Sequence, residues 1–173
     1  MEFFDTIRSR HSIRRYQTRE VEEEKLRKIL EAVDSAPSAG DLQGYEIVLV
    51  RSASTKDALA RAAYGQTPAV QSPVVLVFCA DRLLSASKYG KRGAELYAVQ
   101  DATIAAAYCQ LAATALGLAT VWIGAFDTEA VEAAIGAPEH VTPVAIIPIG
   151  YAAEEPRTTP RRSLGDLVRE ERF

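Results

Sequence analysis

A long alanine-rich segment, residues 94–116, places the strongest constraint on the fold. Its apolar side chains occupy almost the whole circumference of a helix instead of one stripe. Among them are Leu96, Val99, Ile104, Ala107, Leu111 and Leu116. A helix that is apolar on every side has to be buried. Because 173 residues form roughly one small domain, a single molecule can hardly cover this helix. We therefore expect an interface with a second copy of the chain, which would make the protein a homodimer.

Composition excludes several broad classes of protein. Hydrophobic residues make up 48% of the chain and charged residues 25%, as in ordinary globular domains, so residues 1–173 should fold as one domain. The formal net charge of −3 argues against nucleic acid as a partner, because nucleic-acid-binding domains are usually basic. Cys79 and Cys109 stand alone in apolar runs, which indicates buried reduced thiols and no disulfide or metal site.

The beginning of the sequence and its hydropathy give no sign of membrane association. Residues 1–8 lack the charged and then apolar order of a signal peptide. No window of the sequence approaches the ~20 apolar residues that a membrane span requires. We therefore expect a cytoplasmic protein that binds no membrane.

Hydrophobic periodicity predicts helices and strands in alternation. The expected helices cover residues 3–7, 26–33, 54–63, 94–116 and 127–136, and the expected strands cover residues 46–50, 73–79, 119–123 and 144–149. Ser54 is the expected N-cap of its helix. Pro148 cannot donate to a strand ladder, so it should lie at a sheet edge or a strand end. The polar stretch 82–92 should form an irregular excursion or lid. The sum is an α+β or three-layer α/β domain.

The sequence contains none of the common catalytic constellations. His11 and His140 are its only histidines, and it has neither the Gly-x-Ser-x-Gly motif of hydrolases nor a phosphate loop of the Walker type. The dinucleotide fingerprint Gly-x-Gly-x-x-Gly is absent as well. If the protein is an enzyme, a cofactor should therefore carry the difficult chemistry.

A basic segment between the first two expected helices is the first candidate binding site. It reads Arg8-Ser-Arg10-His11-Ser12-Ile-Arg14-Arg15-Tyr16. In an extended loop, alternation would place Arg10, Ser12 and Arg14 on one side. Planar guanidinium groups and a hydroxyl donor together suit a phosphate. The alternative is a solvated basic surface loop.

A second basic cluster, formed by Arg157, Arg161 and Arg162, lies between prolines near the end of the sequence. Taken alone, such a cluster is typical of a solvated tail. If it met the first basic segment in space, the two could clamp a single phosphate.

Two further segments could face a flat ligand. The loop from Pro37 to Gln43 has small side chains that permit close approach of its backbone, although an ordinary helix-to-strand connection would look the same. The segment from Trp122 to Ala125 lies at the end of a predicted strand, and its backbone amides could reach a planar ring. The alternative there is a core tryptophan followed by a turn glycine.

Taken in this order, the segments resemble the nitroreductase family of flavoproteins. The resemblance extends from Arg8 almost to the end of the sequence. It is carried by Arg10-His-Ser-Ile-Arg14, Ala36-Pro-Ser-Ala-Gly-Asp-Leu-Gln43, Gly65-Gln66, Gln100-Asp101, Leu116-Gly-Leu, Trp122-Ile-Gly124 and Pro160-Arg161. It implies an α/β/α sandwich with a mostly antiparallel central sheet, a homodimer of the domain-swapped type, and two FMN molecules at the dimer interface.

The resemblance also implies roles for individual residues. Arg10 and Ser12, with His11 nearby, would hold the FMN phosphate together with Arg161, and Arg162 would help. Arg14 would face the pyrimidine edge of the flavin and stabilise the negative charge of its reduced form. Contacts from the partner subunit would come from Pro37, Ser38, Ala39 and Asp41. Trp122, Ile123 and Gly124 would lie near flavin N5 and O4, and Gln66 and Asp101 match recurring cofactor-binding positions.

One loop departs from the usual pattern of the family, which is Asn-x-Gln-Pro-Trp. Here Asp41 replaces the asparagine, and Gly44-Tyr45 replaces Pro-Trp. An ionised aspartate only accepts hydrogen bonds, so a donor contact to the flavin or the substrate would be lost.

The resemblance implies an FMN-dependent oxidoreductase with NADH or NADPH as electron donor. It would transfer hydride through FMN N5 to an electron-poor acceptor, such as a nitroaromatic or a quinone, by a ping-pong mechanism. One alternative is a dehalogenase-like member of the family in which residues 82–96 form a lid over the substrate. Another is a flavin-binding or redox-sensing module without fast turnover, which the replacements at Asp41 and Gly44-Tyr45 would fit.

Overall fold

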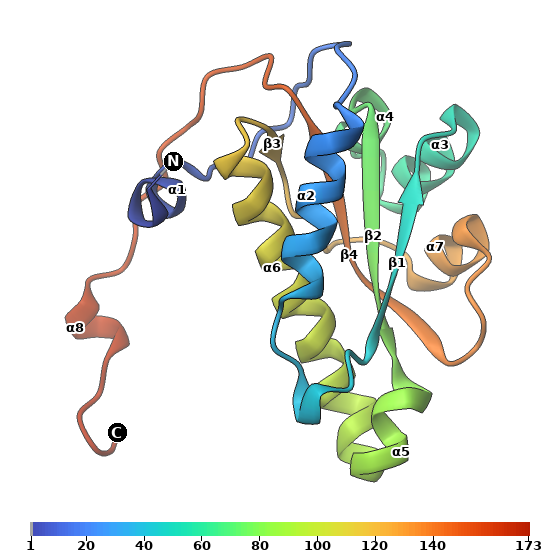
Figure 1. Ribbon diagram of the computed structural model, residues 1–173, viewed down its shortest axis with the longest axis vertical. Coiled ribbons are helices and arrows are strands. Elements are labelled where there is room, and N and C mark those ends of the chain that lie inside the picture. The colour runs from blue at the N-terminus through green and yellow to red at the C-terminus, as the bar shows by residue number, and fades with distance from the viewer. Residues whose placement is uncertain (1) are drawn as a thin grey trace.

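The computed structural model describes residues 2–173, and within that range one antiparallel sheet of four strands forms the centre of the fold (Figure 1). The strands are β1 (Tyr45–Val50), β2 (Val74–Asp81), β3 (Ala119–Thr120) and β4 (Val141–Gly150), and their order across the sheet is β1-β2-β4-β3. With the surrounding helices, this sheet confirms the expected α+β class.

Different helices cover the two faces of the sheet. Phe78 and Ile147 point to the face covered by α2 (Glu23–Asp34) and α6 (Ala98–Ala115). Their neighbours Val77 and Ile146 point to the other face, towards α3 (Ala53–Ala62) and α7 (Thr128–Ile135). Figure 1 shows the two helix pairs on opposite sides of the sheet. Because both faces are covered, β2 is a continuous apolar run and shows no alternation.

The other helical segments are short or lie at the periphery. They are α1 (Phe3–Ser9), η1 (Ala39–Asp41), α4 (Pro68–Gln71), α5 (Arg82–Arg92), the π-helical turn η2 (Gly93–Tyr97) and α8 (Leu164–Leu167). α1 packs beside α6, with Thr6 buried, whereas α8 lies away from the body of the fold in Figure 1. No helix among the described residues is long and apolar enough to cross a membrane.

The segment expected to be an irregular excursion is largely helical. The Asp81 side chain caps α5 by accepting the N–H of Leu84 at 2.9 Å. The helix is interrupted at Gly90, where φ is 55° and ψ is −142°, a conformation that glycine adopts without steric cost. The helix expected from residue 94 is present: residues 93–97 form the π-helical turn η2, and α6 continues it without a break from Ala98.

Two local expectations are wrong. Ser52, and not Ser54, caps α3, because its hydroxyl oxygen accepts the N–H of Thr55 at 3.2 Å. Pro148 lies within β4, between β2 and β3, and not at an edge or a strand end. Ile146 N donates to Ile123 O, and the nitrogen of Pro148, two residues further along β4, faces the same side of the strand. On that side the pairing of β3 with β4 has already ended at Thr120. The missing N–H of Pro148 therefore removes no hydrogen bond between strands.

Candidate functional site

The basic N-terminal segment is attached to the end of β4 by backbone hydrogen bonds. Gln17 N donates to Tyr151 O at 2.9 Å, and Ala153 N donates to Arg15 O at 2.9 Å. Tyr16 and Ala152 form an antiparallel bridge between these bonds. The pairing brings residues 10–15 beside the chain that leaves β4 towards the second basic cluster.

Tyr16 anchors this segment in the interior. Its hydroxyl donates to Ile13 O at 2.8 Å. Its buried ring packs against Gly150, so closely that a Cβ added to this glycine would lie only 3.0 Å from Tyr16 Cδ1. Burial raises the pKa of the Tyr16 hydroxyl well above its usual range, so this group remains a neutral donor. Tyr16 therefore fixes the backbone that carries Arg14 and Arg15.

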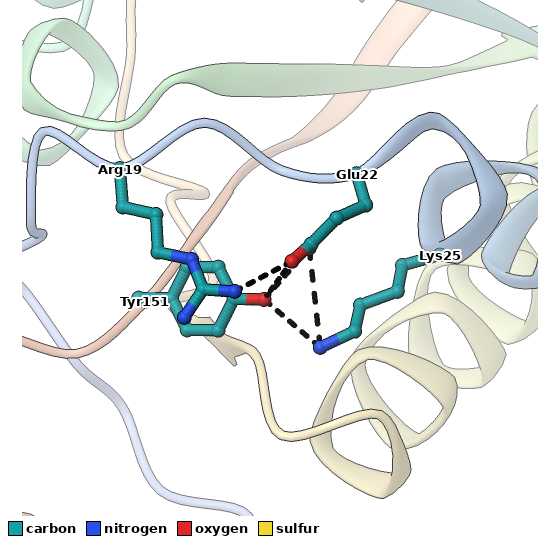
Figure 2. A network of polar contacts seen from close by, with 4 residues as sticks. All are labelled: Arg19, Glu22, Lys25 and Tyr151. Carbon is teal, nitrogen blue, oxygen red and sulfur yellow. Dashed lines mark hydrogen bonds and ion pairs between the residues drawn. The ribbon is translucent and has the colours of Figure 1, made fainter.

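A polar network fastens the same segment to α2 (Figure 2). Tyr151 OH donates to Glu22 Oε2 at 2.7 Å and accepts from Lys25 Nζ at 2.9 Å. The Arg19 guanidinium lies 4.0 Å from the centre of the Tyr151 ring and donates to Glu22 Oε1 at 2.7 Å. The hydrogen bond from Tyr151 lowers the pKa of Glu22 from 4.5 to about 2, with smaller contributions from its own backbone and from Arg19 and Lys25. The connection from the basic segment to α2 is thereby held in one position.

A cavity of about 630 Å³ lies where the two basic segments meet. Both segments contribute arginines to its lining: Arg10, Arg14, Arg15, Arg157 and Arg161. The lining also contains His11 and the neutral groups Ser12, Thr67, Gln71 and Thr159. Ser12 is fixed by a bridge to Thr120 at the end of β3. We call this hollow the basic cavity.

Two carboxylates also line the basic cavity, and one of them has a structural task. Glu154 Oε1 accepts the backbone N–H of Arg14 at 2.5 Å. This bond, together with the nearby backbone N–H of Arg15 and the charges of Arg15 and Arg157, holds the pKa of Glu154 below its usual range. With Glu155 as the second carboxylate, cationic side chains still outnumber acidic ones in the lining. The cavity therefore suits an anion with several oxygens, such as a phosphate monoester.

The small-residue loop lines a second hollow of about 600 Å³ at the N-terminal end of α6. Pro37, Ser38 and Ala39 form one wall, and Tyr97, Val99, Gln100, Asp101, Thr103 and Ile104 form the other. We call it the loop hollow. It is mostly apolar and lies at the opposite end of α6 from the bridge between Ser12 and Thr120.

The remaining predicted site residues occupy different surroundings. Gln66 Nε2 donates to Ala125 O at 3.0 Å, which ties the turn before α4 to the segment after Gly124. The Ile123 side chain is buried in the core, so only its backbone could face a ligand. The Trp122 side chain is partly buried against the core. A Cβ added to Gly124 would lie 2.9 Å from Trp122 Nε1, so any larger residue at position 124 would displace the indole. Asp41 is exposed with φ of 59°.

Arg162 points along the tail, where it donates to Asp166 O at 2.6 Å, and it does not line the basic cavity. Conversely, Thr67, Gln71, Thr159 and Glu154 line the cavity although sequence reasoning had not selected them. Single polar residues in turns carry no periodic signal, and only the pairing of residues 13–17 with the end of β4 brings them together.

Comparison with known proteins agrees with this geometry. The profile of the Nitroreductase family matches residues 7–81 and 66–151. A Thermus thermophilus protein named NADH dehydrogenase is 37% identical over 186 residues, covering 92% of this chain and 91% of its own length. The Bacillus subtilis FMN reductase [NAD(P)H] is 33% identical over 176 residues, covering 92% of this chain and 70% of its own. The chain belongs to the nitroreductase family, as its motifs suggested.

A solved structure gives the same result for the fold. The NADPH:FMN oxidoreductase of Vibrio harveyi in complex with NAD⁺ superposes with a TM-score of 0.91 at 27% identity, covering 99% of this chain and 77% of that one. The similarity therefore includes the whole sheet and the helices on both of its faces.

Proposed function

We propose that this protein is an FMN-dependent NAD(P)H oxidoreductase that works as a homodimer. The observation that carries the proposal is the convergence of Arg10, Arg14 and Arg161, from the two ends of the chain, on the basic cavity. The names of two similar proteins, an FMN reductase and an NADPH:FMN oxidoreductase, support the same cofactor and electron donors.

The donor set of the basic cavity fits the phosphate of FMN. Guanidinium groups present paired N–H donors to phosphate oxygens, and Ser12 adds a neutral donor from a fixed backbone. A phosphate monoester with nearly two negative charges would be balanced by Arg10 and Arg161. Arg157 and Thr159 line the cavity from the same segment as Arg161 and would supply further contacts.

When bound, FMN would accept hydride from NAD(P)H and pass it to an electron-poor acceptor such as a nitroaromatic or a quinone, in a ping-pong sequence. The residues of the chain bind and orient. Arg14 would lie beside the flavin ring, and its permanent charge would stabilise the negative charge that reduction brings. The small side chains from Pro37 to Ala39 would let a flat ring approach their backbone.

The need for both hollows supports a dimer. They lie near opposite ends of α6, which has 18 residues and is therefore roughly 27 Å long at 1.5 Å per residue. A mononucleotide is shorter than this helix, so a second copy of the chain is the simplest source of the loop hollow that would meet an FMN molecule held in the basic cavity. If two copies pair through antiparallel α6 helices about a two-fold axis, the loop hollow of one copy comes next to the basic cavity of the other.

Exposed apolar side chains support the same interface. Val99 and Tyr108 on α6 are 38% and 39% exposed, and Phe3 and Phe4 on α1 are 64% and 68% exposed. An apolar hollow between α1 and α6 is lined by Phe3, Tyr108 and Leu111. Exposed apolar surface of this kind marks an interaction site. The exposed tail with α8 could reach around a partner, as in a domain-swapped dimer.

The direct test is the visible absorption spectrum of the purified protein, recorded before and after addition of NADPH under anaerobic conditions. We expect a flavin spectrum that bleaches within seconds and recovers when a quinone is added. A colourless protein that binds no added FMN would refute the proposal. Bound flavin that stays oxidised in the presence of both NADH and NADPH would indicate a redox-sensing module.

A further inference from the structure

The loop that forms one wall of the loop hollow has a strained backbone. Gly40 and Asp41 both have φ of 59°, and Gln43 has φ of 49°. Aspartate tolerates this left-handed region moderately well and glutamine less so. Such a conformation persists only where surrounding contacts hold it in place.

Asp101 supplies one of these contacts from the first turn of α6. Its Oδ1 accepts the backbone N–H of Ala39 at 2.9 Å, and the residue is only 2% exposed. Ala39 lies directly before the strained residues, so this bond joins the loop to the long helix. Lys88 Nζ adds an exposed contact to Gly40 O at 3.3 Å from α5.

The second carboxylate oxygen of Asp101 is unusual. Among the residues that the structure describes, Asp101 Oδ2 and Ser85 Oγ are the buried side-chain polar atoms without a hydrogen-bond partner. Both lie close to Gly44, where a Cβ would be 3.1 Å from Asp101 Oδ2 and 3.7 Å from Ser85 Oγ. An unpaired buried carboxylate oxygen is costly, so the bond that Oδ1 makes to Ala39 is kept at the expense of stability.

We infer that Asp101 is a positioning residue that holds the loop 38–41 in its strained shape, seated between Gly44 and Ser85. The inference rests on the proposed function, in which this loop faces the flavin of the partner subunit. Asp101 acts through the Ala39 amide and does not touch the flavin itself. The position of the loop sets the width of the loop hollow, because Ser38 and Ala39 form its wall opposite Tyr97.

To hold the loop, Asp101 needs an oxygen that accepts the Ala39 N–H, but it does not need a negative charge. Variants that remove only the charge, or the acceptor as well, therefore separate the two properties. In Asp101→Asn the carbonyl oxygen can still accept from Ala39, and the amide presents a donor on the side where Ser85 Oγ lies. Asp101→Ala removes the acceptor. Gly44→Ala inserts a methyl group against Oδ2, and Gly44 has no positive φ that would strain alanine.

The loop position can be read in the full-length protein without flavin. Hydrogen exchange of the Ala39 amide, followed by NMR, should accelerate at least tenfold in Asp101→Ala and change less than threefold in Asp101→Asn. Thr114→Ala is the matched control, because it removes a buried hydroxyl that lies on the same helix and donates to Gln110 O within that helix. Unchanged protection of Ala39 in Asp101→Ala would overturn the inference, even if the protein binds no flavin at all.

The reconstituted holoprotein gives the second reading. We expect Asp101→Ala to weaken FMN binding at least tenfold and to alter the visible circular dichroism of the flavin, with Gly44→Ala intermediate and Asp101→Asn close to wild type. Thr114→Ala should lower the Tm and leave both flavin readings unchanged. If Asp101→Asn behaves like Asp101→Ala, the charge is what matters and the positioning role is wrong. If wild-type protein binds no FMN, the proposed function fails, whereas the exchange experiment still decides the role of Asp101.

Discussion

Arg14 and Glu154 are joined across the basic cavity by a bond from backbone to side chain, Arg14 N to Glu154 Oε1 at 2.5 Å. A carboxylate thus orders the backbone of a cationic residue inside a cavity that suits an anion. It stabilises the shape of the site and at the same time opposes the charge of a phosphate. Substitutions at Glu154 can separate these two effects.

Glu154→Gln keeps an oxygen acceptor for Arg14 N and removes the negative charge. We expect FMN to bind about two- to fivefold more tightly, because the variant removes one exposed negative charge from beside the phosphate. The dissociation constant can be measured by quenching of flavin fluorescence. Glu154→Ala, which loses the acceptor as well, should bind more weakly than Glu154→Gln. Equal affinity of the two variants would show that the hydrogen bond to Arg14 contributes nothing to binding.

Arg161→Ala should weaken FMN binding about tenfold to 100-fold, because a hydrogen bond to a charged group contributes roughly 1.5–3 kcal/mol. The Tm of the apoprotein should change little, since Arg161 is exposed. Arg27→Ala is the matched control, because Arg27 pairs with Glu31 on the surface of α2 and lies outside the lining of the basic cavity. Equal losses of affinity in the two variants would point to general electrostatics and not to a phosphate contact.

The network in Figure 2 predicts a dependence of stability on pH. The folded state holds the pKa of Glu22 at about 2, below its ordinary 4.5, so its stabilising contribution is complete above about pH 4.5 and disappears as the pH falls towards 2. In Glu22→Gln, the loss of stability between pH 5 and pH 2 should be smaller, as measured by urea denaturation at each pH. An identical acid slope in the variant would contradict this assignment.

The exposed face of α6 can be tested for dimer formation. Tyr108→Lys should shift the protein towards the monomer and reduce FMN binding with it, because a charge would be buried in an apolar interface. Sedimentation velocity measures the first effect and flavin fluorescence the second. Leu49→Lys is a control of equal exposure, since Leu49 on β1 and Tyr108 are both 39% exposed. A Tyr108→Lys protein that remains dimeric with bound FMN would exclude this face as the interface.

Sequence patterns predicted the central elements well because these elements are governed by local periodicity. The buried run of β2 and the helix expected between residues 127 and 136, which is capped by Asp127 and ends at Gly136, agree with the structure. The helix over residues 82–92 was missed because Gly90 and Gly93 interrupt its pattern, while the capping bond from Asp81 is a single contact. Ser52 and Ser54 are both typical capping residues. Because β1 ends at Val50, Ser52 is the first serine after the strand, and α3 begins directly after it at Ala53.

The candidate site was predictable only in part. The two arginine-bearing segments were recognised as a possible phosphate clamp, and the structure brings Arg10 and Arg161 to the same cavity. Their meeting depends on the pairing of Tyr16 with Ala152, which no periodic pattern announces. The burial of Asp101 likewise depends on the packing of α5 and β1 around it, so spacing alone could not reveal its bond to Ala39.

The central claim is that Arg10 and Arg161 bind one FMN phosphate, and the comparison of FMN with riboflavin tests it most directly. Riboflavin carries the same ring system without the phosphate. We expect apoprotein to bind FMN at least 100-fold more tightly than riboflavin, and this ratio to fall about tenfold or more in Arg10→Ala and in Arg161→Ala, while the affinity for riboflavin stays the same. Equal affinity of the wild-type protein for the two flavins would contradict the account.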